Sequence, residues 1–218
     1  MAPRQIVRYM QIVACLTDPA QAAAAEAQGA QVLELRLDLM EGNPKDRVRQ
    51  CKAISRLPVI ATLRSAEEGG RYFGSPEEWQ KKIAPVIPLV EYIDVEQQFA
   101  RMAGPVKAAG KGIIASHHTA GMVPLPILFV LEQELRSYGE IPKIVVTPGN
   151  EEDLIDLIAF TRAAKKPICT GVMGAAFRYA RAILPLFGSE FVYCHTGVPT
   201  AVGQYSVEEF VTLAKLLS

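Results

Sequence analysis

QVLELRLDL, residues 31–39, alternates charged and apolar side chains over most of its length. Successive side chains of a β-strand point to opposite faces, so Glu34, Arg36 and Asp38 share one face and four leucines share the other. On a lone antiparallel strand, such a charged face would lie in water. What the charges mean therefore depends on the strands that surround this one.

Seven other short apolar runs recur along the chain, separated by helical stretches. Their length and their β-branched residues indicate strands, and their continuous apolarity indicates strands that are covered on both faces. The eight runs are residues 11–17, 31–39, 58–64, 91–96, 112–118, 143–148, 167–173 and 190–196.

The helical stretches have recognisable starts. Asp18 is a predicted N-cap before a proline, and Ser75 and Ser206 each precede a glutamate by three residues, which is the capping-box spacing. Strand and helix alternating eight times predict a (β/α)8 TIM barrel, an α/β fold, with a single domain over residues 1–218. The alternative is an open doubly wound sheet. It would need a G-x-G-x-x-G loop after the first run, where the chain reads LTDPAQAAAAE.

The barrel changes the interpretation of residues 31–39. One face of each barrel strand packs on helices, so the charged face has to point into the interior. Buried charges are costly unless they are paired or used. The barrel therefore favours a functional role for Glu34 and Arg36.

Further polar residues lie at the carboxyl ends of the runs, where such barrels carry their active sites. Arg64 ends one run and is followed by a glycine-rich loop that contains Glu68. Asp94 and Glu96 share one face near the end of the next run. These residues are candidates for the same site, although the loop alone would suit solvent equally well.

Two candidates are ambiguous on the residues alone. His117 and His118 are adjacent, so only one of them can point into the barrel mouth, where a histidine suits acid–base chemistry. Lys143 would be a nucleophilic amine if it were buried in a strand. It begins its run, however, and a lysine at the edge of a strand can also lie along the surface.

Composition narrows the classes of function. The chain has 23 Lys plus Arg and 23 Asp plus Glu, so no basic field indicates nucleic-acid binding. No apolar run approaches the ~20 residues that a membrane span needs. The four cysteines have no zinc-ligand spacing and are expected to be reduced thiols of a cytoplasmic protein. A small-molecule substrate is therefore expected.

Seven pieces in a fixed order resemble the type I 3-dehydroquinate dehydratases across nearly the whole chain. No single piece is very specific, but the order is. They are ELRLD (34–38), TLRSAEEGG (62–70), YIDVE (92–96), SHH (116–118), PKI (142–144), the segment 173–189 with Arg181 six residues before FGS, and the lid segment 200–204 ending in GQ.

The resemblance implies a hydro-lyase that dehydrates 3-dehydroquinate to 3-dehydroshikimate by syn elimination through a lysine Schiff base. It assigns the imine to Lys143 and the proton transfers to His118 rather than His117, with Glu68 orienting His118. It also implies substrate contacts at Glu34, Arg36, Arg64, Arg181 (with nearby Arg178 at a variable position), and at Thr200 and Gln204 of the lid.

The resemblance further implies a cytoplasmic homodimer of the shikimate pathway, which leads to chorismate and the aromatic amino acids. No metal or other cofactor is expected.

Two other functions stay open. A class I aldolase-like barrel would also use a strand lysine, and a barrel could bind dehydroquinate without turning it over. The second is allowed by departures from the family pattern. Thr119-Ala120 follows His118 where Asp or Asn and then Phe are usual, Ala180 replaces a serine, and the lid carries Val202.

Overall fold

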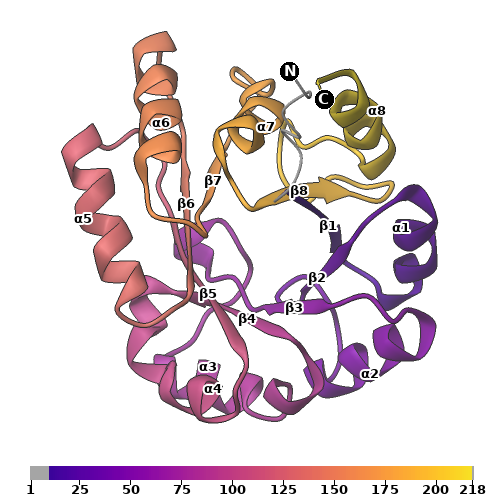
Figure 1. The fold of residues 1–218 in the computed structure, drawn as a ribbon. Coiled ribbons are helices and arrows are strands. Elements are labelled where there is room, and N and C mark those ends of the chain that lie inside the picture. The colour runs from indigo at the N-terminus through magenta and orange to yellow at the C-terminus, as the bar shows by residue number, and fades with distance from the viewer. Residues whose placement is uncertain (1–9, 218) are drawn as a thin grey trace.

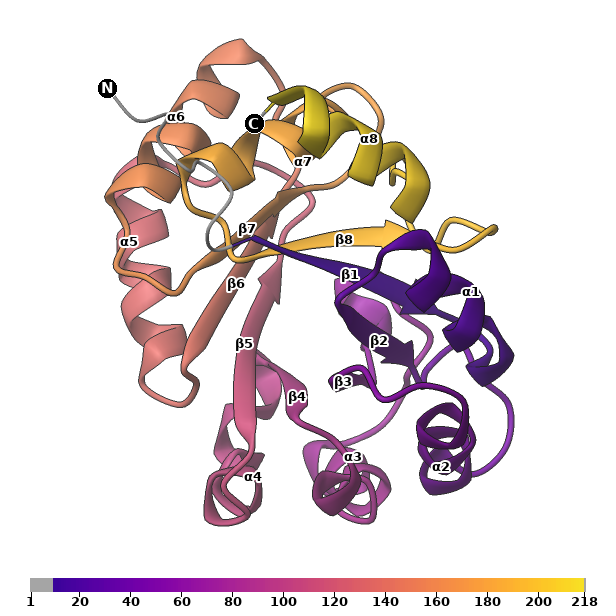
Figure 2. The same ribbon diagram turned by 45° about the vertical axis from the view of Figure 1, so that its right-hand side comes forward.

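The computed structural model describes residues 10–217, which form the expected (β/α)8 barrel. Eight strands pair in the order β7-β6-β5-β4-β3-β2-β1-β8, and neighbouring strands in this order run parallel. Figure 1 looks into the ring of strands, with the helices around its outside, and Figure 2 shows the same ring obliquely.

All eight predicted strands are present, and each begins within two residues of the expected start. They are β1 (Gln11–Leu16), β2 (Val32–Arg36), β3 (Val59–Thr62), β4 (Tyr92–Glu96), β5 (Gly112–His118), β6 (Ile141–Val146), β7 (Cys169–Val172) and β8 (Phe191–His195).

The helices cover the outer face of the barrel. The α-helices are α1 (Ala22–Gln28), α2 (Pro44–Ile54), α3 (Pro76–Ile83), α4 (Gly104–Ala108), α5 (Leu125–Arg136), α6 (Glu151–Ala163), α7 (Ala180–Ile183) and α8 (Val207–Leu217). Short 3-10 helices are η1 (Pro19–Gln21), η2 (Ala66–Glu68), η3 (Ile87–Leu89), η4 (Gln97–Met102) and η5 (Leu184–Phe187).

The predicted helix starts are also present. Asp18 and Ser75 each form a full capping box, before η1 and α3 respectively. At α8, the Ser206 N–H donates to Glu209 and the Glu209 N–H donates back to the Ser206 hydroxyl. These reciprocal bonds satisfy amides that the first turn of a helix leaves unpaired.

The barrel closes between β7 and β8, where only a few hydrogen bonds join the two segments. The Glu190 N–H donates to the Ile168 carbonyl at 2.8 Å. The Ser189 hydroxyl accepts from the Thr170 N–H at 2.9 Å and donates to the Thr170 carbonyl at 3.1 Å. A buried side chain thus supplies hydrogen bonds that strand backbones provide elsewhere in the barrel.

Apolar residues fill two regions. The larger core lies between strands and helices. A smaller cluster plugs the interior at the amino-terminal end of the strands: Val13, Val32, Ile60, Ile114, Ile141, Cys169 and Phe191. Alternation along each strand then turns the next inward residue, such as Glu34 after Val32, into the space above this plug. No helix within residues 10–217 is long and apolar enough to span a membrane.

Candidate active site

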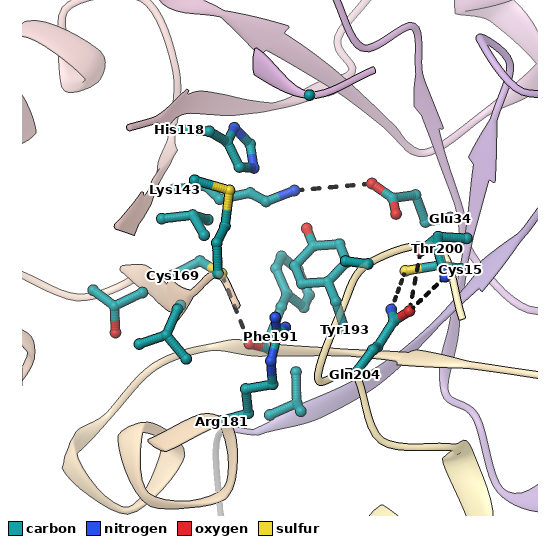
Figure 3. Close-up of a pocket in the computed structure, with 18 of the residues that line it drawn as sticks. Cys15, Glu34, His118, Lys143, Cys169, Arg181, Phe191, Tyr193, Thr200 and Gln204 are labelled. Carbon is teal, nitrogen blue, oxygen red and sulfur yellow. Dashed lines mark hydrogen bonds and ion pairs between the residues drawn. The ribbon is translucent and has the colours of Figure 1, made fainter. Parts of the chain in front are cut away.

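A cavity of about 160 Å³ opens above the apolar plug, at the carboxyl ends of the strands. This is the end at which barrels of this type build their sites. All nine residues selected from the sequence line it, and Figure 3 shows several of them facing the same space. They are Glu34, Arg36, Arg64, Glu68, His118, Lys143, Arg181, Thr200 and Gln204.

Lys143 lies inside the barrel and not along its surface. It is the third residue of β6, only 4% exposed, and its side chain enters the cavity (Figure 3). Its Nζ donates to Asp94 Oδ2 at 3.1 Å and lies 3.8 Å from Glu34 Oε1. The same atom lies 3.9 Å from the centre of the Tyr193 ring. The amine is thus held at the cavity wall by two carboxylates and one aromatic face.

Asp94 connects this amine to a buried arginine. Its Oδ2 also pairs with Arg64 Nη2 at 2.8 Å, and its Oδ1 accepts from the Ser116 hydroxyl at 2.6 Å. Burial alone would raise the pKa of Asp94, but Arg64 and Lys143, with the hydrogen bond from Ser116, hold it below its usual value. Asp94 is therefore an anion in the folded protein.

Arg64 also pairs with two further buried acids, Glu68 and Glu96. Its Nη1 lies 3.0 Å from Glu68 Oε2 and 3.1 Å from Glu96 Oε1. Burial disfavours the charge of Arg64, yet Asp94, Glu96 and Glu68 together raise its pKa above the ordinary value. A guanidinium has enough donors to serve all three at once.

His118 faces the cavity and Glu68 holds it there. The distance from His118 Nδ1 to Glu68 Oε2 is 2.7 Å, which leaves Nε2 for a ligand. Burial, together with Arg64 and Lys143, lowers the pKa of His118 well below 6.5. Burial also raises the pKa of Glu68 to about 8, against the opposing effect of Arg64. The pair is thus a buried unit that can hold or release one proton near neutral pH.

His117 does not share this position. It is not among the residues that line the cavity, and its Nδ1 lies 3.7 Å from Glu68 Oε1. The assignment of the inward position to His118 therefore agrees with the geometry.

The two charged residues of β2 are satisfied by different neighbours. Arg36 forms a two-pronged pair with Asp38, with Nε–Oδ1 at 2.9 Å and Nη2–Oδ2 at 2.8 Å. Glu34 accepts from the Thr62 hydroxyl at 2.8 Å and faces Lys143 across the cavity (Figure 3). The inward orientation expected for this strand is confirmed.

Arg181 is the cation without an anion. Among residues 10–217, no carboxylate lies within 4.0 Å of its guanidinium, and its buried Nε has no hydrogen-bond partner. Its Nη2 donates to the Val202 carbonyl of the β8–α8 loop at 3.3 Å. Burial lowers the pKa of Arg181 from its usual value, as expected for an uncompensated cation. By contrast, Arg178 pairs with Glu209 at 2.9 Å.

The β8–α8 loop closes the remaining side of the cavity. Gln204 Oε1 accepts from the Thr200 N–H at 2.9 Å and from its hydroxyl at 3.1 Å, and Gln204 Nε2 donates to Cys15 Sγ at 3.3 Å. These bonds fix the two predicted lid residues against each other and against β1.

Several residues in or beside the cavity were given no task from the sequence. Asp94 and Ser116 lie behind the cavity lining and occur in the quoted motifs, and they connect Lys143 to Arg64. Tyr193, Cys15 and Cys169 resemble core residues because their strands are apolar. Only their register in β8, β1 and β7 would have placed them inside, since each lies on the inward face.

Within the described residues, no group of three or more His, Cys, Asp or Glu side chains is arranged to hold a metal ion. The chemistry that the arrangement supports is that of an amine nucleophile, a histidine base and an unpaired guanidinium around one small cavity.

The chain is similar to known proteins over nearly its whole length. The family model for type I 3-dehydroquinase matches residues 14–218. A 3-dehydroquinate dehydratase of Methanoregula boonei is 76% identical over 96% of this chain and 100% of that protein. One from Methanospirillum hungatei is 40% identical over 97% of this chain and 82% of that protein. The crystal structure of the 3-dehydroquinate dehydratase from Aquifex aeolicus is 28% identical, with a TM-score of 0.81 over 95% of this chain and 98% of that one.

The ion network yields a prediction about stability. Arg64→Met leaves Glu68, Asp94 and Glu96 without their shared cation, and losing one partner of buried ion pairs costs about 3–5 kcal/mol. Without Arg64, burial would raise the pKa of Asp94 and raise that of Glu68 further. The variant must then either keep buried carboxylates ionised without this partner or bind protons, and binding protons costs less free energy at low pH. We therefore expect a larger loss of unfolding free energy at pH 8 than at pH 5, measured by urea denaturation.

Arg49→Met is the matched control, because Arg49 forms an exposed pair with Asp46 at 3.8 Å. It should change the unfolding free energy by less than ~0.5 kcal/mol. Equal losses for Arg64→Met at both pH values would contradict an electrostatic role for Arg64.

Proposed function

Because the chain belongs to the type I 3-dehydroquinase family, a family of hydro-lyases, we propose that it dehydrates 3-dehydroquinate to 3-dehydroshikimate through a Schiff base on Lys143. One observation carries the proposal. A buried lysine amine reaches the cavity beside a histidine that is bound to a carboxylate. Opposite them lies an arginine that has no anionic partner among residues 10–217.

Imine formation is the first step. The Lys143 amine attacks the C3 carbonyl, and the resulting carbinolamine loses water to give a protonated imine. The ammonium first loses its proton to water, and Asp94, whose Oδ2 lies 3.1 Å from Nζ, holds the amine in position for the attack. The protonated imine is an electron sink, which makes the neighbouring C2 proton acidic enough to remove.

His118 performs the proton transfers of the second step. Its Nε2 takes one C2 proton, and the electron pair moves into the imine to form an enamine. The enamine then expels the C1 hydroxyl, which leaves as water with the proton from the His118 imidazolium. One base acting on both atoms implies that both bonds break on the same face. Hydrolysis of the product imine restores Lys143.

Glu68 supports His118 in both directions of transfer. As a carboxylate it accepts from Nδ1–H, which fixes the tautomer that leaves Nε2 as the base. It also stabilises the imidazolium that forms in between. A carboxylate behind a catalytic histidine has this role in hydrolytic triads.

Arg181 is the proposed site for the substrate carboxylate. A guanidinium binds a carboxylate through two parallel hydrogen bonds, and Arg181 is the cation of this cavity that still has such donors available. Glu34, Arg36 and Arg64 are proposed to surround the substrate hydroxyls. Thr200 and Gln204 would close the lid over the bound ring.

The departures from the family pattern bear on the two rival functions. Neither Thr119 nor Ala120 is among the residues that line the cavity. Thr119 bonds backbone groups of Val145 and Gly121. The unusual pair therefore alters a loop behind His118 and leaves the proposed reacting groups in place, which favours turnover over binding alone. No specific observation favours an aldolase.

Assembly, location and pathway form part of the proposal. The barrel is proposed to act as a single catalytic domain without a cofactor, in a cytoplasmic homodimer that serves the shikimate pathway. Sedimentation velocity at micromolar concentration should give one species of twice the chain mass, and a monomer would refute the dimer.

Borohydride trapping tests the Schiff base. We expect 3-dehydroquinate plus borohydride to inactivate the protein and to add the reduced substrate to Lys143, as seen by peptide mass spectrometry. Lys143→Ala should lose both effects. His118→Ala should still trap the imine, because His118 acts after imine formation, while kcat falls by ~10³-fold. A protein that turns over substrate but never traps it would overturn the mechanism.

The Glu68–His118 pair predicts a pH dependence. His118 is a base only after the pair has released its proton, and the pKa of Glu68 is raised to about 8. We therefore expect kcat/KM to decline as the pH falls below about 8. In Glu68→Gln this carboxyl is gone, and the remaining His118 has its pKa held well below 6.5. The acid-side decline should then move below pH 6.5, while kcat falls by ~10²-fold because the imidazole loses its anchor.

Glu67→Gln is the matched control, since Glu67 is exposed and does not line the cavity. Its pH profile should equal that of the unchanged protein. An identical acid-side decline in Glu68→Gln would show that another group sets it.

A further inference from the structure

Tyr193 is a cavity residue whose position the proposed mechanism does not use. It lies in β8 between Phe191 of the apolar plug and the barrel mouth. The Lys143 Nζ sits over its ring, 3.9 Å from the ring centre. A cation at this distance from an aromatic face is attracted by the negative charge of the π-system. The ring thus holds the amine, or an iminium that replaces it, at a fixed place.

The hydroxyl of Tyr193 has no partner. Its oxygen is buried, yet among the described residues it makes no hydrogen bond. Buried tyrosine hydroxyls usually find a partner, because an unmet donor is costly. Figure 3 shows this hydroxyl turned toward the gap between Lys143 and Glu34. Burial, with Cys169, Glu34 and Asp94 nearby, raises the pKa of Tyr193 well above its usual value, so the group remains a donor.

The proposed reaction determines which part of the substrate fills that gap. Lys143 is bonded to C3, and C2 has to face His118 for its proton to be removed. The other ring neighbour of C3 is C4, which carries a hydroxyl. Because C2 faces His118, C4 lies on the side of C3 away from His118. In Figure 3, Glu34 and the Tyr193 hydroxyl lie on that far side of Nζ.

We propose that Tyr193 is a substrate-binding residue whose hydroxyl donates to the C4 hydroxyl oxygen of the bound substrate while that hydroxyl donates to Glu34. The C4 group then satisfies a donor and an acceptor that face the same gap. This assignment rests on the proposed dehydration. It adds a residue that binds the C4 hydroxyl, next to the imine carbon. It makes Tyr193 a determinant of specificity for a ketone with a neighbouring hydroxyl.

The test removes the Tyr193 hydroxyl from the protein and the C4 hydroxyl from the substrate, separately and together. Tyr193→Phe keeps the ring over Lys143 and should lower kcat/KM for 3-dehydroquinate by about 3–12-fold, the usual size of one neutral hydrogen bond. With the analogue that lacks the C4 hydroxyl, the same substitution should change kcat/KM by less than about twofold. Borohydride trapping of 3-dehydroquinate should persist in Tyr193→Phe, because the imine does not need the hydroxyl.

Tyr92→Phe is the matched control. Tyr92 packs against the apolar plug at the opposite end of the barrel interior and is not among the cavity-lining residues. It should leave kcat/KM unchanged. A Tyr193→Phe protein with unchanged kcat/KM, or with the same loss on both substrates, would overturn the assignment. An unsubstituted protein that neither turns over 3-dehydroquinate nor traps an imine would instead overturn the proposed dehydration.

Discussion

The site depends on one buried cation. Arg64 pairs with Asp94, Glu68 and Glu96 inside a barrel where unpaired charge is costly. Asp94 in turn holds the Lys143 amine, and Glu68 holds His118. The proposed nucleophile and the proposed base are therefore positioned by the same guanidinium. A lysine could not replace it, because a single ammonium lacks the planar set of donors that reaches three carboxylates.

The barrel makes this arrangement possible because its inward residues fall into layers. Apolar side chains at the amino-terminal end exclude water from below, and the next inward layer carries the acids and Lys143. A long side chain on this middle layer can reach the cavity from an early strand position. The long side chain of Lys143, the third residue of β6, therefore reaches the cavity at the carboxyl end of the strands. The shorter side chain of His118 reaches it from the last position of β5.

Sequence reasoning succeeded where local patterns carry the information. The eight strands follow from apolar runs, and the inward face of β2 follows from alternation once a barrel is assumed. The residues alone did not decide whether Lys143 enters the barrel or which of the two histidines points inward. Strand position does not say how far a side chain reaches or which residues of a strand face inward. The resemblance selected Lys143 and His118, and these two line the cavity. Tyr193 was missed since a tyrosine in an apolar strand looks the same whether its hydroxyl meets solvent, protein or substrate.

The lid shows why some sequence departures leave the site intact. Arg181 donates to the backbone carbonyl of Val202, so the identity of that side chain, which is 69% exposed, does not enter the contact. Gly203 is constrained differently. Its φ is +78°, and a Cβ there would lie 2.5 Å from the Gly174 carbonyl oxygen. A carboxylate bound by Arg181 would use donors that the Val202 carbonyl leaves free. The lid backbone thus lies beside the proposed carboxylate site, and its path there depends on glycine at 203 but not on the side chain at 202.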